Sequence, residues 1–342
     1  MNRLRKTKMI NNTNLIHLPY TPDLTEGGIA FAIRSLLYSF DHSGSSLYNR
    51  LRHVAAEAAV ELAFRRYLSQ QDIPFEIRSA APFTEPDKFN VTLGGHRCDI
   101  KSFLISHRSQ IAEMRRSPQV LLNAPALVPS DHHINEGYSD SDLYLFAFLS
   151  GLTAASQDDL KKVIETNQPH YLVHAMPAAW RKPQKWNPLG PLVLKSESEA
   201  GMLVEINGQD SGRGFLTRLV TLPAKMRVTV EDPFYSVTSV LVKNMPLARL
   251  GIHSPLHREA HVISPLDWGN IWVYGMDIIL TGFISSGEFR QRARSVAPNS
   301  RVFQYDRTKT KNLAVPISSL NPLQELLTRV REWSRQNTGE NN

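Results

Sequence analysis

The stretch that decides the fold is residues 86–101, PDKFNVTLGGHRCDIK, where two β-prone runs flank a Gly-Gly pair. Such a pair between β-prone runs predicts a hairpin with a two-residue loop. Counting outward from the two glycines places Asn90 opposite Asp99. Because side chains alternate along a strand, Asn90, Asp99 and Lys101 are expected to share one face of the hairpin.

The other face of this hairpin is apolar. Phe89, Val91, Leu93, Cys98 and Ile100 fall on it by the same alternation. A strand pair with one apolar face packs that face against a neighbouring element, so we expect it to be buried. The polar face is then the place to look for function.

A carboxylate, an amide and an ammonium group meet on the polar face. Mg²⁺ prefers oxygen ligands, usually one or two carboxylates together with waters and a phosphate oxygen. The expected ligands are Asp99, the side-chain carbonyl of Asn90 and the main-chain carbonyl of Ile100. Such a metal site suits the hydrolysis of a phosphodiester. In that reaction Lys101 is expected to orient the attacking water or to stabilise the phosphate in the transition state.

The helix predicted over residues 51–68 precedes the hairpin and is rich in alanine. It carries Glu57 and Glu61 one turn apart on the same face. Either of them is able to add a carboxylate to the site. Glu57 is preferred, and Glu61 is the less favoured ligand, because Glu57 lies among alanines, where a helix approaches a sheet closely.

The residues from 50 to 120 resemble the core of the PD-(D/E)xK, restriction-endonuclease-like nucleases. In that superfamily a Glu-bearing helix precedes two strands, the first with an Asp and the second with Asp/Glu-x-Lys. The resemblance implies that Asp99 is a metal ligand and Lys101 the catalytic lysine, with Glu57 or Glu61 as the helix carboxylate.

The first acidic position departs from that pattern. Asp87, in Pro86-Asp87, lies three residues before Asn90 and on the opposite side of the strand, so only a bulge would bring it into the site. Either Asn90 replaces the usual Asp, or Asp87, a less favoured ligand, serves through a bulge or a different loop length.

The resemblance implies a Mg²⁺-dependent endonuclease that hydrolyses DNA, with Mn²⁺ as a substitute. Double-stranded DNA is the expected substrate, and prokaryotic restriction or anti-phage (antiviral) defence the expected context. A homodimer or a defence-system partner protein is expected as well. The alternative is a catalytically weak or inactive nuclease-fold subunit that binds DNA or assembles a larger complex.

Length and pattern predict two domains in this chain of 342 residues. The fold class expected is α/β. Residues 1–165 are expected to form a restriction-endonuclease-like mixed sheet flanked by helices. Residues 166–342 are expected to form a β-rich domain that binds DNA or a partner and ends in a helix. Helices are predicted over 24–40, 51–68, 107–122, 141–152, 158–166, 286–297 and 322–336.

The net charge of +7 favours nucleic acid as a partner, and the densest basic run lies in residues 290–311. Cys98 is the single cysteine, so a disulfide within the chain is impossible and a reducing compartment is expected. No apolar run is long enough for a membrane span. A cytoplasmic protein with no membrane partner is therefore expected.

Overall fold

The computed structural model describes residues 10–36, 47–77, 91–131, 139–154, 156–166, 171–242, 248–271 and 274–337. Contacts within the chain divide it into two compact units. Unit 1 takes Met1–Phe31, His53–Gly151 and Gly275–Asn342, and unit 2 takes Ala32–Arg52 and Leu152–Tyr274. The division differs from the expected one at 165/166, because the last part of the chain returns to unit 1.

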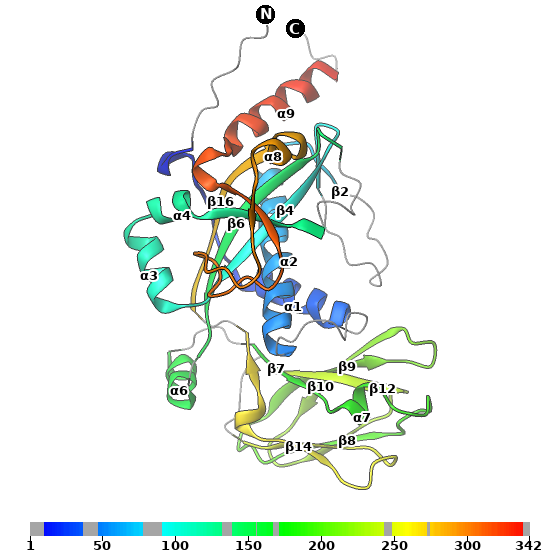
Figure 1. Ribbon diagram of the computed structural model, residues 1–342. Coiled ribbons are helices and arrows are strands. Elements are labelled where there is room, and N and C mark those ends of the chain that lie inside the picture. The colour runs from blue at the N-terminus through cyan, green and yellow to red at the C-terminus, as the bar shows by residue number, and fades with distance from the viewer. Residues whose placement is uncertain are drawn as a thin grey trace, which may run out of the picture. The chain divides into compact units, whose positions relative to one another are not determined.

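A seven-stranded mixed sheet is the centre of unit 1, in the order β1-β16-β6-β4-β3-β2 with β19 paired to β16. The strands β4 and β6 are parallel, whereas β3 is antiparallel to both β4 and β2. Figure 1 shows β16, β6 and β4 side by side. Their bounds are β1 (Ile16–Leu18), β2 (Glu76–Ile77), β3 (Val91–Leu93), β4 (His96–Ile105), β6 (Leu143–Leu152), β16 (Tyr274–Ser285) and β19 (Asn321–Pro322).

The strand β6 corrects the helix predicted over residues 141–152. It lies between β4 and β16, and residues 143–151 are buried along its whole length. A strand covered on both faces has no alternation of apolar and polar side chains, so its sequence is a continuous apolar run. Such a run does not distinguish a buried strand from a buried helix.

The described helices that lie wholly or mostly in unit 1 arise mostly where the sequence predicts them. The 107–122 helix is divided in two, because the Ser117-Pro118 pair disfavours helical geometry at the residue before proline. The predicted alanine-rich helix is α2, and its inner face carries the buried residues Ala55, Ala58 and Ala59. The bounds are α1 (Pro22–Leu36), α2 (Leu47–Gln70), α3 (Arg108–Arg116), α4 (Gln119–Asn123), α8 (Ser286–Arg292) and α9 (Leu323–Asn337).

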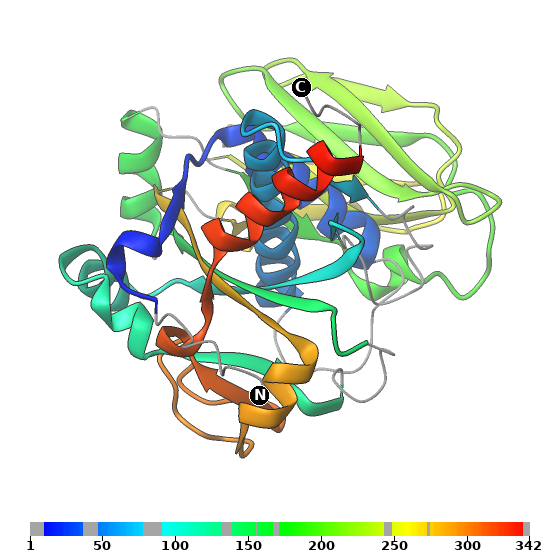
Figure 2. The same ribbon diagram turned by 90° about the horizontal axis from the view of Figure 1, so that it is seen from above.

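A second, three-stranded sheet of unit 1 contains β5 (Pro125–Pro129), β17 (Arg294–Val296) and β18 (Asn312–Pro316) in the order β17-β18-β5. Figure 2 shows the orange 294–316 segment folded beside the teal β5. The helix predicted over 286–297 therefore ends early, at Arg292, and a strand follows it.

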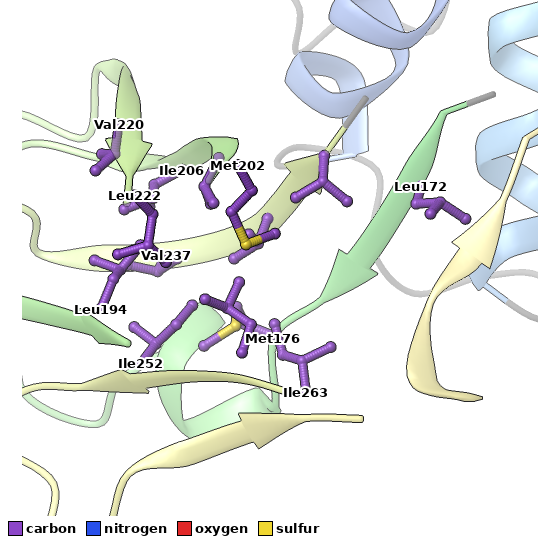
Figure 3. Close-up of a cluster of buried hydrophobic side chains, with 14 of the residues drawn as sticks. Leu172, Met176, Leu194, Met202, Ile206, Val220, Leu222, Val237, Ile252 and Ile263 are labelled. Carbon is purple, nitrogen blue, oxygen red and sulfur yellow. The ribbon is translucent and has the colours of Figure 1, made fainter. Parts of the chain in front are cut away.

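Unit 2 is β-rich, with antiparallel sheets in the orders β10-β9-β12-β7-β15 and β11-β8-β13-β14. Side chains from both sheets, among them Leu194 of β8, Ile206 of β9 and Ile252 of β13, meet in one buried cluster (Figure 3). The bounds are α6 (Gln157–Glu165), β7 (Leu172–Ala175), α7 (Ala178–Arg181), β8 (Leu192–Ser196), β9 (Met202–Gln209), β10 (Phe215–Leu222), β11 (Arg227–Val230), β12 (Ser236–Val242), β13 (Leu250–His253), β14 (His261–Ile263) and β15 (Gly269–Asn270).

Among the described residues, no helix is both long enough and apolar enough to cross a membrane.

Candidate active site

The β3–β4 hairpin has the register that the sequence predicts. Its last pair before the turn joins Leu93 to His96, and Val91 lies opposite Cys98. Both loop glycines have positive φ, 55° and 79°, as the favoured two-residue hairpin turn requires. Two predicted site residues, Asn90 and Asp87, lie outside the described residues.

Asp99 and Lys101 lie on the same face of β4, as predicted. The Lys101 Nζ is 2.7 Å from Asp99 Oδ2, and the two side chains are 17% and 12% exposed. Asp99 is paired with Tyr144 in the neighbouring parallel strand β6, so the acid lies in the interior of the sheet. An acid and an amine that are nearly buried yet reach solvent are suited to a reaction at the sheet surface.

Glu61 on α2 interacts electrostatically with Asp99. Burial raises the pKa of Glu61 to about 8, the neighbouring Arg65 opposes this rise, and the charge of Asp99 adds to it. Arg65, one turn further along the helix, also donates a hydrogen bond to Glu61 Oε1. Glu61 is therefore held close enough to Asp99, at the junction of α2 and β4, for the charge of Asp99 to raise its pKa.

Glu57, the glutamate preferred from the sequence, lies one turn before Glu61 on α2, and its place in the site stays a prediction. The side chain of Glu57 is exposed. Its charge adds to the effect of burial in raising the pKa of Tyr305. The two glutamates share a helix face but are about 6 Å apart along the axis. The charge of Asp99 contributes to the raised pKa of Glu61, which supports Glu61 as a site residue.

The donor set of Glu61 and Asp99 is compatible with a hard divalent cation, which commonly takes one or two carboxylates from a protein. The third expected donor, the main-chain carbonyl of Ile100, belongs to the residue paired with Leu145 in the β4–β6 ladder. No cluster of three or more His, Cys, Asp or Glu side chains suited to a metal occurs within the described ranges. The site thus offers two carboxylates, and the residues at 87 and 90 are not placed.

Two residues near the site were not predicted from sequence. Arg65 lies four residues after Glu61, which is the spacing of a helical ion pair, and this signal was available in the sequence. Tyr305 comes from a distant segment, and its ring packs edge-on against Phe103 of β4 with centroids 6.3 Å apart. No local sequence pattern predicts such a contact.

In unit 2, His261 lies on strand β14 and meets His174 of β7. Since a carbonyl oxygen only accepts, His174 Nδ1–H donates to the carbonyl of Asp267 at 3.0 Å. The Nε2 atoms of His174 and His261 share a hydrogen bond at 2.9 Å. Burial first, and then His174, lower the pKa of His261. The pair therefore links the two sheets.

No family model, curated protein or solved structure matches this chain. The class of site is accordingly defined by its own side chains, two adjacent buried carboxyl groups and a lysine on an α/β scaffold.

Proposed function

We propose that unit 1 is the catalytic core of a Mg²⁺-dependent endonuclease that hydrolyses DNA phosphodiester bonds. The observation that carries the proposal is the meeting of Glu61, Asp99 and Lys101 at the junction of α2 and β4. Two acids and an amine are the side chains that metal-assisted phosphodiester hydrolysis uses.

The ionisation of Glu61 supports a cation at this site. With a pKa of about 8, Glu61 holds a proton at neutral pH, because burial disfavours its charged form and the charge of Asp99 adds to this effect. Glu61 and Asp99 together would hold the cation, and its charge favours the ionised form of Glu61. A bound Mg²⁺ supplies charge neutralisation at the phosphate and a more acidic water.

Lys101 has a separate role in this proposal. Its ammonium group lies beside Asp99 and retains access to solvent. From this position it is able to orient a water molecule or to stabilise negative charge that develops on a phosphate oxygen. Asp99, in turn, keeps the ammonium group in place when no phosphate is bound.

A second candidate function is favoured by the same contacts. Both carboxyl groups have a cationic partner within the protein, Arg65 for Glu61 and Lys101 for Asp99. These two cations partly neutralise the charge that would attract a metal ion. The alternative is therefore a nuclease-fold subunit that binds DNA, or assembles a larger complex, without cutting.

Supercoiled plasmid incubated with Mg²⁺ or Mn²⁺ tests the proposal. Wild type is expected to nick it, and Asp99→Asn, Glu61→Gln and Lys101→Met are each expected to lose activity by about 10² or more, since each removes a group from the reacting centre. Glu113→Gln changes an exposed helical glutamate and serves as the control. Plasmid that is bound but never nicked, by any form with either metal, would favour the alternative.

The wider context is also a proposal. We infer a cytoplasmic protein of prokaryotic restriction or anti-phage defence, acting as a homodimer or with a partner, because cutting both strands of a duplex requires two active centres. If supercoiled plasmid is converted to the linear form as protein concentration rises, two active centres are acting together on the two strands. Unchanged phage plating efficiency with and without the expressed protein would contradict the defence role.

A further inference from the structure

The basic side chains at residues 290–311 fall into two groups, those that are ion-paired and those that are not. Arg290 is paired with Asp140, and Arg292 is paired with Glu288. Five others are exposed and form no ion pair within the described part of the chain. These five, on what we call the basic segment (residues 294–311), are Arg294, Arg301, Arg307, Lys309 and Lys311.

The basic segment has a fixed backbone. Thr308 donates its N–H to the carbonyl of Ser300 at 2.9 Å, and its hydroxyl donates to Ala297 O at 2.8 Å. An isolated β-bridge joins Val302 to Tyr305. Arg301 and Arg307 are thus the neighbours of paired backbone positions in one tight hairpin. Holding cations on an ordered backbone lowers the entropy lost when they bind a partner.

The charge of this segment is strongly one-sided. Between residues 301 and 311 there are four basic side chains and one acidic side chain, Asp306. Asp306 lies 3.8 Å from His107. Exposed cations that outnumber the single acid repel one another, so the segment carries an electrostatic cost that an anionic partner would relieve.

The basic segment is anchored next to the candidate site. Tyr305 packs against Phe103, which follows Lys101 by two residues on the same face of β4, about 7 Å along the strand. The charge of Glu57 on α2 also contributes to raising the pKa of Tyr305. The basic segment is therefore anchored, through Tyr305, to the same face of the sheet as Asp99 and Lys101.

We propose that the basic segment binds the phosphodiester backbone of a nucleic-acid duplex and positions it over the face that carries Asp99 and Lys101. This inference rests on the proposed function, and it adds the surface that holds the substrate. Phosphate contacts by Lys and Arg release counterions, so this binding weakens steeply as salt rises. It is also independent of base sequence.

Binding without cleavage tests the inference. Wild type and the triple variant Arg301→Gln, Arg307→Gln, Lys309→Gln are titrated in EDTA onto fluorescent duplexes of equal length, one of DNA and one of RNA. The triple variant is expected to bind at least 10-fold more weakly at low salt. The slope of log K against log salt should become shallower by about 2 to 3, or roughly 0.9 per lost phosphate contact.

A matched control removes the same charge from unit 2. The variant Arg218→Gln, Lys225→Gln, Arg249→Gln also replaces two arginines and one lysine, but each of these three is ion-paired, with Asp232, Glu199 and Glu197 respectively. It is expected to keep the wild-type slope. Melting curves of both triple variants verify that they are folded.

The outcomes separate the two proposals. Equal losses in both triple variants, or no duplex binding by wild type, would overturn the role of the basic segment. A loss of duplex affinity confined to the 301–309 variant supports it. The duplex that binds more tightly, DNA or RNA, identifies which nucleic acid the segment binds. The nuclease proposal fails on a different result, which is bound plasmid that is never nicked in the presence of metal.

Discussion

Glu61 makes the stability of the protein depend on pH in an unusual direction. Its pKa rises from an ordinary 4.5 to about 8 on folding, mainly through burial. Between these values the folded state binds more protons than the unfolded state, so this group lowers stability as pH rises, by up to about 1.4 kcal/mol per unit. Below pH 4.5 its full favourable contribution is present, and above 8 it is lost.

The variant Glu61→Gln removes this titration. We expect its unfolding free energy, measured by urea denaturation between about pH 5 and 8, to lack the decline attributable to this group. Glu113→Gln, at an exposed position, should keep the wild-type decline. Identical pH profiles for wild type and Glu61→Gln would show that Glu61 is ionised in the folded protein.

Part of the candidate site was predictable because it depends on local geometry. Asp99 and Lys101 are two residues apart on a strand, and alternation alone places them on one face. The choice between Glu57 and Glu61 depends instead on how far α2 is shifted along its axis relative to the sheet. Nothing in the sequence of the helix itself encodes that shift.

The β3–β4 turn gives a prediction at the scale of an element. Both glycines have left-handed φ, and a Cβ on Gly94 would lie 2.6 Å from the Trp333 ring, whereas one on Gly95 would meet nothing within 4 Å. Gly95→Ala should therefore cost about 1 kcal/mol of backbone strain. Gly94→Ala should cost more, because the Trp333 ring must also move.

Thermal or urea unfolding of the two variants, with Gly95→Asn as the control, measures this difference. Asparagine tolerates the left-handed region, so Gly95→Asn should lie closer to wild type than Gly95→Ala. An equal cost at Gly94 and Gly95 would mean that the Trp333 contact does not constrain the turn.

Elements with local signals were predicted, and those with tertiary causes were not. The register of the β3–β4 hairpin follows from its turn residues and is confirmed. The strand β6 was predicted as a helix, because its central place in the sheet, which removes the alternation, is decided by distant partners.

At the scale of the molecule, the sequence indicated two parts but not their interleaving. The strand β16 begins at Tyr274 and pairs with β1, whose residues Ile16–Leu18 lie near the start of the described chain. Pairing over so long a sequence separation leaves no local signature, because it depends on complementary edges rather than on composition. The β-rich character of unit 2 was visible, whereas its end at residue 274 was not.

A core substitution tests whether units 1 and 2 are independent. Ile206 is fully buried in the unit 2 cluster, whereas Leu203, on the other face of the same strand, is 42% exposed. Ile206→Ala should cost about 2–5 kcal/mol and Leu203→Ala far less. If the units unfold separately, hydrogen exchange in Ile206→Ala should accelerate in peptides from 171–263 and stay unchanged in peptides from 275–337. A sequence division at 165/166 predicts instead that both regions lose protection together, so faster exchange in α9 and β16 would contradict the division by contacts.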